Sequence, residues 1–453
     1  MITVEIDGIF SPMLERGLDR QRFSALIPDL IAAQRELNAR RSRDIGFYDA
    51  PLRRDLVQGV LEEVRRLRAI ADDLLVLGIG GSSLGGQALC AALGHTSERE
   101  VRVHFLDNID PDSVVMMLES LEPERTAAAV ITKSGDTVET LAQLLVVRRW
   151  FRASLGQGEA RSRMTYVTDP NKGTLRDLAR SEGIRAFDIP PEVGGRYSVL
   201  TPVGLLPAAF LGIDIIEVLA GAADMAERVG SINVEENPAC LFAAGAMLAQ
   251  KELGRNSLVM MPYADSLRVA TAWFVQLWAE SLGKRFDRYG KEVHSGQTPI
   301  PALGAIDQHA QLQLFIEGPT DKAICMVAVE KFRHELVIPD ELAERDELNY
   351  LCGRDLGELF SAERRGTRAA LLDAGVPVLD ISIPMVDEQS FGGFLLLLEA
   401  ASACAGLLIG VNPFDQPGVE AGKRMTMGLI GRAGYSEDIA SVIARESLAD
   451  RLT

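Results

Sequence analysis

From about residue 60, short apolar and β-branched runs alternate with stretches of helical periodicity. Helical stretches such as 137–155 separate the runs. Because strands that alternate with helices form parallel βαβ units, this part of the chain predicts a parallel, doubly wound sheet. Its expected strands are 74–80, 101–108, 127–134, 164–170 and 184–190.

A second, looser series of strands and helices follows the Gly- and Pro-rich stretch 194–214. We interpret that stretch as the crossover between two α/β domains. The strands expected after it are 256–264, 323–330 and 377–384. The first fifty and last forty residues have helical patterns and are expected to pack across both domains. The predicted division is an N-terminal helical segment, a first domain, a second domain and a C-terminal helical segment, at 1–55, 56–215, 216–415 and 416–453.

The most membrane-like segment runs from Phe394 to Val411. Glu399 interrupts it and the surrounding pattern is that of a soluble protein, so we predict a buried helix and no membrane span. The N-terminal sequence MITVEIDGIF lacks a basic region followed by an apolar one, which is typical of a protein without an export signal. We therefore expect a cytoplasmic protein.

Composition narrows the possible partners. With 453 residues, 47% of them hydrophobic, the chain can bury more than one core. Its formal net charge of −17 disfavours binding to nucleic acid or to an anionic membrane. The five cysteines form no CxxC pair, which is typical of reduced core thiols in a cytosolic protein. Metal chemistry is not expected either, because the histidines are scattered without an HExxH motif: His95, His104, His294, His309 and His334.

Two loops have the composition of phosphate-binding sites. The first, LGIGGSSLGG at 77–86, leaves a strand and enters a helix, so its glycines let backbone amides approach an anion. It is not a Walker loop, because it does not end in Gly-Lys-Ser/Thr. It also matches the dinucleotide-binding motif poorly, because Ser83 stands where that motif needs Gly or Ala. Asp107, after the next strand, keeps the dinucleotide interpretation open. The second, VITKSGDTVET at 130–140, adds hydroxyl donors at a similar strand-to-helix junction.

Either loop alone could be a simple helix start, with Thr137 and Ser82 or Ser83 as N-caps. Two such loops at the carboxyl ends of strands in one sheet favour a phosphorylated small molecule instead.

Acid–base chemistry is the remaining candidate. Gln276 and Glu280 share one face of a predicted helix, with the apolar rings of Trp273 and Trp278 nearby, so Glu280 could be a partly dehydrated base. An ordinary surface ion pair between Glu280 and Lys284 explains the same spacing. The other candidates could equally have ordinary structural roles: Arg196 in an inter-domain ion pair, His309 as a loop residue and Lys423 as a helix-surface lysine.

Six segments, in order, resemble the bacterial type of the glucose-6-phosphate isomerase (phosphoglucose isomerase) family. They are GIGGSSLGG, TKSGDTVET, GGRYSVLTPVGLLP, QLWAESLGK, QHAQLQL and GLLIGVNPFDQPGVEAGK. The last is the most specific, because its spacing from Gly406 to Lys423 agrees with the family's C-terminal signature. The resemblance implies two sugar-isomerase (SIS) domains and interconversion of glucose 6-phosphate and fructose 6-phosphate, without metal or organic cofactor.

The resemblance also implies residue roles. Glu280 matches the base that moves a proton between C1 and C2 through a cis-enediolate, Arg196 the residue that stabilises this anion, and Gln276 a substrate contact. His309 and Lys423 match the groups that open the sugar ring, with His309 supplied by the neighbouring subunit of a homodimer. The residues implied to hold the phosphate or to lie near it are Gly81, Ser82, Ser83, Thr132, Lys133, Ser134, Thr137 and Gln416.

One residue departs from the family pattern. Asp136 stands where family members usually carry a hydroxyl, and a carboxylate facing a phosphate would repel it. We expect Asp136 to point away and to offset the charge of a helix N-terminus; altered phosphate affinity is the alternative.

Three other functions stay open at this point. A related isomerase could act on mannose 6-phosphate or on an amino-sugar phosphate, although no ammonia-handling domain is evident. A non-catalytic sugar-phosphate sensor would keep the hydroxyl loops but would not need Glu280, Arg196, His309 and Lys423 together. A nicotinamide dehydrogenase is supported only by Asp107.

Overall fold

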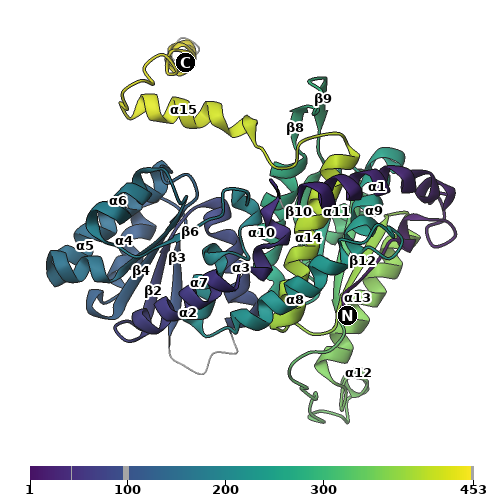
Figure 1. Cartoon of the computed structure of the whole chain (residues 1–453). Coiled ribbons are helices and arrows are strands. Elements are labelled where there is room, and N and C mark those ends of the chain that lie inside the picture. Colours follow the sequence, from purple (N-terminus) through teal and green to yellow (C-terminus); the bar gives the residue numbers. More distant parts are fainter. Residues whose placement is uncertain (42, 95–100, 450–453) are drawn as a thin grey trace.

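The computed structural model describes residues 1–41, 43–94 and 101–449 (Figure 1). Its described residues contain two five-stranded sheets, one in each half of the molecule, with helices packed around them and a small two-stranded hairpin. His95 lies outside the described residues.

The first sheet is entirely parallel, in the order β3-β2-β4-β5-β6. Three of its strands are buried along their whole length, as expected for a parallel sheet covered on both faces. The strands overlap all five predicted runs and confirm the doubly wound sheet: β2 (Asp73–Leu77), β3 (Arg102–Leu106), β4 (Thr126–Thr132), β5 (Met164–Thr168) and β6 (Ala186–Asp188).

The strand order of this sheet creates a binding crevice. From β2 the chain moves to β3 on one side, and β4 is later added on the other side, so the direction of winding reverses between β2 and β4. Loops leaving the carboxyl ends of strands diverge at such a point, and ligands bind there. The loops that leave β2 and β4, at 78–83 and 133–137, are the two predicted phosphate loops. The topology therefore places them side by side.

The second sheet has the order β1-β12-β11-β7-β10 and is parallel except for β1, which runs antiparallel to β12. Its three central strands match the prediction: β7 (Ser257–Pro262), β11 (Lys322–Val329) and β12 (Val378–Ile383).

Both edge strands of this sheet are missing from the prediction. β1 (Thr3–Glu5) has only three residues, too few to show a period, so the expectation of a wholly helical N-terminal segment was wrong at its start. β10 (Thr298–Pro301) contains two prolines, which are tolerated at a sheet edge but argue against a strand in the sequence. The hairpin of β8 (Lys284–Phe286) and β9 (Glu292–Ser295) was also not predicted.

The helices surround the two sheets and join them. α3 packs against both α7 and α10, and so connects the first sheet with the second half of the chain. Around the first sheet lie α2 (Arg54–Arg68), α3 (Leu84–Leu93), α4 (Pro111–Glu119), α5 (Val138–Ser162), α6 (Thr174–Glu182) and α7 (Pro202–Leu211). The other helices are α1 (Gln21–Arg40), α8 (Ile215–Arg228), α9 (Pro238–Leu253), α10 (Arg268–Leu282), α11 (Leu312–Glu317), α12 (Asp346–Asn349), α13 (Leu356–Asp373), α14 (Glu388–Leu408), α15 (Glu420–Leu429) and α16 (Ala440–Ala449).

Local sequence sets the ends of α9 clearly. Asn237 accepts hydrogen bonds from the amides of Ala239 and Cys240, and Pro238 takes the first helical position, where its missing N–H costs nothing. Gly254, at φ 69°, ends the helix in a left-handed conformation that favours glycine.

Helix α14 is the apolar segment that was predicted to be a buried helix. Among the described residues it is the one helix long and apolar enough to cross a membrane, and 89% of its apolar window is buried inside the protein. It packs against α8, α9 and α10, which makes it a core helix. Glu399 lies in its middle, fully buried, and neither carboxyl oxygen has a hydrogen-bond partner in the part of the chain that the structure describes.

The two ends of the chain behave differently. The N-terminal segment contacts both halves, as predicted: α1 packs on α9 and α14, while the Gly46 amide donates to the carbonyl of Glu192. The C-terminal segment does not pack across the two sheets in the single chain. Figure 1 shows α15, in yellow, projecting away from the body. Apolar side chains on this arm are exposed, among them Val419, Leu429 and Ile430.

We expect the substitution Glu399→Gln to change how stability depends on pH. Burial raises the pKa of Glu399 well above its ordinary value, so the carboxyl takes up a proton on folding. Its contribution to stability is complete below its unfolded pKa of about 4.3 and is lost as the pH rises, by up to about 1.4 kcal/mol per pH unit. The amide does not titrate. We therefore expect the free energy of unfolding in urea to fall less between acidic and neutral pH in the variant than in the wild type. An equal fall in the two proteins would contradict a neutral Glu399.

Candidate active site

Three hydroxyl groups meet in the loop between β4 and α5. The Thr132 and Thr137 oxygens are 2.7 Å apart, and the Ser134 oxygen lies 3.4 Å and 3.3 Å from them. The N-terminus of α5 directly follows, and a helix N-terminus presents backbone N–H groups and a positive dipole end. Neutral donors of this kind suit an anion such as a phosphate monoester.

Helix capping does not explain these hydroxyls. Thr137 and Ser83 occupy the N-cap positions of α5 and α3, yet neither side chain accepts a capping hydrogen bond. The Ser83 hydroxyl oxygen accepts instead from the side-chain amide of Gln87, which also donates to the Asp107 carboxylate at 2.7 Å. Asp107, the one support for a dinucleotide site, is thus engaged by a neighbouring side chain.

Asp136 points away from the hydroxyl groups, as expected. Its carboxylate accepts hydrogen bonds from the backbone amide of Thr174 at 3.0 Å and from the Thr174 hydroxyl at 2.6 Å. Thr174 is the first residue of α6, so the charge offsets the N-terminus of that helix. Gly135, at φ 75°, allows this close approach, since a Cβ atom there would lie 2.8 Å from Gly173 Cα.

Lys133 has a more enclosed position than a surface lysine. Its ammonium group donates to the carbonyl of Pro191 at 3.3 Å, and burial lowers its pKa below the ordinary value. Nearby carboxylates, those of Asp169 and Glu192, counter part of that shift. Its contact with a phosphate stays a prediction.

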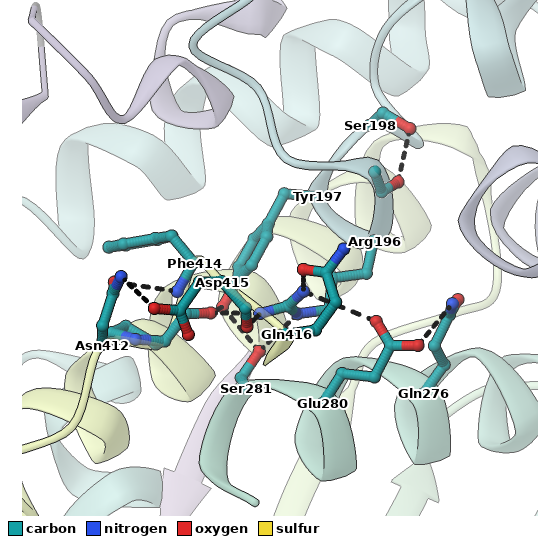
Figure 2. A network of polar contacts seen from close by, with 12 residues as sticks. Arg196, Tyr197, Ser198, Gln276, Glu280, Ser281, Asn412, Phe414, Asp415 and Gln416 are labelled. Carbon is teal, nitrogen blue, oxygen red and sulfur yellow. Dashed lines mark hydrogen bonds and ion pairs between the residues drawn. The ribbon is translucent and has the colours of Figure 1, made fainter. Parts of the chain in front are cut away.

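Arg196 is the most completely bonded side chain of the site. It lies in the short turn η7 (Gly195–Tyr197), and its side chain is 2% exposed. A guanidinium has five N–H donors, and five acceptors surround this one. They are Ser281 Oγ (2.9 Å), Glu280 Oε2 (3.4 Å), Gln416 Oε1 (2.9 Å), Pro413 O (2.5 Å) and Asp415 O (3.1 Å) (Figure 2).

Glu280 lies between Arg196 and Gln276. One carboxylate oxygen is 3.4 Å from the guanidinium, and the other accepts from Gln276 Nε2 at 3.3 Å (Figure 2). The side chain is 32% exposed, so a ligand can reach it while the cation beside it stays fixed. A carboxylate held in this way can accept a proton, and the adjacent guanidinium can stabilise a developing anion.

The contacts of Glu280 exclude the alternative of a surface ion pair with Lys284. Trp273 and Trp278 belong to the apolar core, and the side chains that the Glu280 carboxylate contacts are those of Arg196 and Gln276. Lys284 makes no surface ion pair with the Glu280 carboxylate, because its ammonium is buried and donates to the Glu280 main-chain carbonyl. Neither burial could be inferred from the spacing of residues on one helix.

The first predicted phosphate loop packs against the turn that carries Arg196 and against Gln276, a neighbour of Glu280. A Cβ atom on Gly81 would lie 2.5 Å from the carbonyl of Gly195, next to Arg196. One on Gly80, at φ 58°, would lie 2.9 Å from Gln276 Nε2. Only glycine permits this packing, so the loop that carries Ser82 lies directly against the turn and the helix of the candidate catalytic groups.

His309 and Lys423 lie apart from this network in the single chain. His309 is exposed at the end of the turn η9 (Ile306–His309), and Lys423 is exposed on α15, where it pairs with Glu420 at 3.0 Å. No hydrogen bond or ion pair of the described residues joins either of them to Arg196 or Glu280. Within the same described ranges, no three His, Cys, Asp or Glu side chains gather closely enough to hold a metal ion.

Three further contributors to the site were not singled out in the sequence. Ser281 follows Glu280 and bonds both Arg196 and the hydroxyl of Tyr197. The main-chain carbonyls of Pro413 and Asp415 accept from Arg196. Their segments are part of the family motifs, but the acceptor role of a backbone carbonyl leaves no mark in the residue type.

Comparison with known proteins shows the family of the chain. The Phosphoglucose isomerase family model matches residues 65–443. The glucose-6-phosphate isomerase of Carboxydothermus hydrogenoformans is 42% identical over 98% of this chain and 97% of its own length. A glucose-6-phosphate isomerase of Thermus thermophilus is 40% identical over 93% of this chain and 98% of its own length.

Solved structures show the same fold. The crystal structure of a hypothetical protein from Thermus thermophilus aligns with a TM-score of 0.85 and 39% identity, over 95% of this chain and 100% of the other. A glucose-6-phosphate isomerase of Chlamydia trachomatis aligns with a TM-score of 0.78 over 88% of this chain and 77% of the other; at 24% identity it supports the fold alone. Since the family model and relatives at this identity both span most of its length, the chain belongs to the phosphoglucose isomerase family.

Proposed function

We propose that this chain interconverts glucose 6-phosphate and fructose 6-phosphate, with Glu280 as the base. The activity is the one for which the family is named. The observation that supports the residue assignment is the contact between a reachable carboxylate and a buried guanidinium, beside the first predicted phosphate loop at 77–86. A sugar phosphate fixed by its phosphate group would present its first two carbons to this pair.

Binding begins with the phosphate. The hydroxyls of Thr132, Ser134 and Thr137 and the amides at the start of α5 donate to its oxygens, with Lys133 adding charge nearby. Gly81, Ser82 and Ser83 close the other side. Since these contacts lie away from the reacting carbons, their binding energy orients the substrate for the chemical step.

The chemical step is a proton transfer between neighbouring carbons. Glu280 removes the proton from C2 of the open-chain aldose, and the electrons move to O1 to form an enediolate. Arg196 stabilises that negative charge without moving, because its other donors are already bound. Return of the proton to C1, with transfer of the O2 proton to O1, gives the ketose. Gln276 and Gln416 contact the substrate hydroxyls.

Ring opening requires a second proton donor and acceptor. We assign it to His309 and Lys423, with His309 supplied by a second copy of the chain in a homodimer. Two features support this assembly: among the described residues of one chain neither side chain has a hydrogen bond or ion pair with Glu280, and the C-terminal arm exposes Leu429 and Ile430, whose apolar surface a second copy could bury. The dimer acts in the cytoplasm without an organic cofactor.

Glu280→Gln should separate catalysis from binding. The amide keeps the size of the side chain but cannot take a proton, so we expect kcat to fall by about 10²- to 10⁴-fold. Exchange of the C2 proton with solvent should disappear, while calorimetric binding of fructose 6-phosphate changes little. Glu62→Gln, on the remote helix α2, is the matched control. Retained C2 exchange would remove Glu280 from the base role, and wild type that binds but does not isomerise would favour a sugar-phosphate sensor.

Joint replacement of Thr132 and Ser134 by Ala should weaken binding. Each lost hydrogen bond to a charged group costs about 1.5–3 kcal/mol, so KM should rise by at least about tenfold. Inorganic phosphate should become a weaker competitive inhibitor by a similar factor. An unchanged KM would show that the phosphate binds elsewhere.

Mixing two inactive variants tests the shared site. If His309 comes from the partner, subunit exchange between Glu280→Gln and His309→Asn dimers gives heterodimers with one intact site. Activity should return to about a quarter of the wild-type value, because half of a random mixture is heterodimer with one working site of two. No recovery under conditions of proven exchange would place both residues in one chain's site.

A further inference from the structure

Lys284 follows helix α10 and is one of the most enclosed lysines of the chain. Its side chain is 4% exposed. An ammonium group has three donors, and three main-chain carbonyls accept from this one: Glu280 O, Ser281 O at 3.2 Å and Asp415 O at 3.0 Å. The Asp415 carboxylate lies 3.7 Å away and balances the charge. A neutral amine has only two N–H donors and could not satisfy all three carbonyls.

These three carbonyls belong to two segments that are far apart in sequence. Two come from the last turn of the helix that carries Glu280, where the negative end of the helix dipole attracts a cation. The third comes from the loop 412–416, which also accepts two hydrogen bonds from Arg196 through its main chain. The carbonyl of Asp415 is shared by Lys284 and Arg196. Lys284 is therefore a direct tie between the helix of the base and the loop that holds the guanidinium.

We propose that Lys284 is a positioning residue, which clamps the loop 412–416 onto the end of α10 and so keeps Arg196 and Gln416 facing Glu280. This proposal rests on the proposed function of the same site. Lys284 does not touch the substrate in this scheme, and its influence on catalysis passes through Asp415 and Arg196.

The clamp depends on the charge of Lys284. Burial, and then the nearby charge of Arg196, lower the pKa of Lys284 to about 8, although Asp415 acts in the opposite direction. The charged groups around it on the packed elements are Glu280, Arg196, Asp415, Glu36, Arg40, Arg285, Asp287 and Arg288. Several of these pair with one another or elsewhere: Arg288 with Glu36, Arg40 with Asp44 and Arg285 with Glu292.

We expect Lys284→Met to lower kcat by roughly tenfold to hundredfold, since a displaced reacting group has a cost of this order. KM for fructose 6-phosphate should stay nearly constant, because the hydroxyl loops are not touched. The control is Lys322→Met at the start of β11: Lys322 is also buried, at 7% exposure, and also bonds a main-chain carbonyl, that of Pro319, but far from the site. It should lose stability without losing kcat. Equal kcat values for the two variants would overturn the proposal.

Two further measurements complete the test. Hydrogen exchange of the segment 411–419 should quicken in Lys284→Met and not in Lys322→Met; equal exchange would overturn the clamp even in an inactive protein. The alkaline fall of the wild-type kcat should lie near the pKa of Lys284, about 8. In Lys284→Arg, which keeps its charge, kcat should begin to fall only at a higher pH. A fall of kcat at the same pH in that variant and in the wild type would also overturn the proposal. If the wild-type protein had no isomerase activity, the proposed function would be rejected. Hydrogen exchange of the segment 411–419 would still test whether Lys284 holds the loop 412–416 in place.

Discussion

The site depends on the buried guanidinium of Arg196. Removing a charge from water is costly unless every donor finds an acceptor, and here the end of α10 and the loop 412–416, with the side chain of Gln416, supply the acceptors. The same requirement that satisfies the charge fixes those segments relative to one another. A cation that is bound on all sides cannot follow the substrate, so it favours the species in which negative charge develops beside it.

The proposed phosphate subsite follows from a different constraint, the winding of the first sheet. The reversal between β2 and β4 opens the carboxyl edge at the point where two loops lead into helices. Hydroxyl groups and helix amides can bind a dianion without carrying charge themselves, so in the proposed function the guanidinium of Arg196 serves the reacting end of the substrate. Asp136 can remain in such a loop because Thr174 draws its carboxylate toward α6.

In the proposed chemistry, groups on core elements transfer the proton between carbons, and exposed groups open the sugar ring. Glu280, Arg196 and the hydroxyl loops sit on elements packed into a core that spans both sheets. Lys423 sits on α15, outside that core, and His309 is exposed on a turn of the second half. Proton transfer between carbons needs the rigid groups, whereas ring opening precedes it and can rely on groups that assembly brings in.

The sequence by itself determined the elements and the chemistry of single residues. Eight strands of the two sheets and the buried helix α14 follow from apolar runs that have a clear period, and the hydroxyl loops follow from composition at strand ends. The short edge strands β1 and β10 escaped prediction, because a three-residue strand shows no period and prolines argue against strands. Only the tertiary structure decided which side chains meet: that Lys284 lies inside, that Thr174 is the partner of Asp136, and that carbonyls of the loop 412–416, at least 131 residues from their donors, accept from Arg196 and Lys284. Contacts between distant segments depend on how helices and sheets pack, and local residue patterns do not encode that packing.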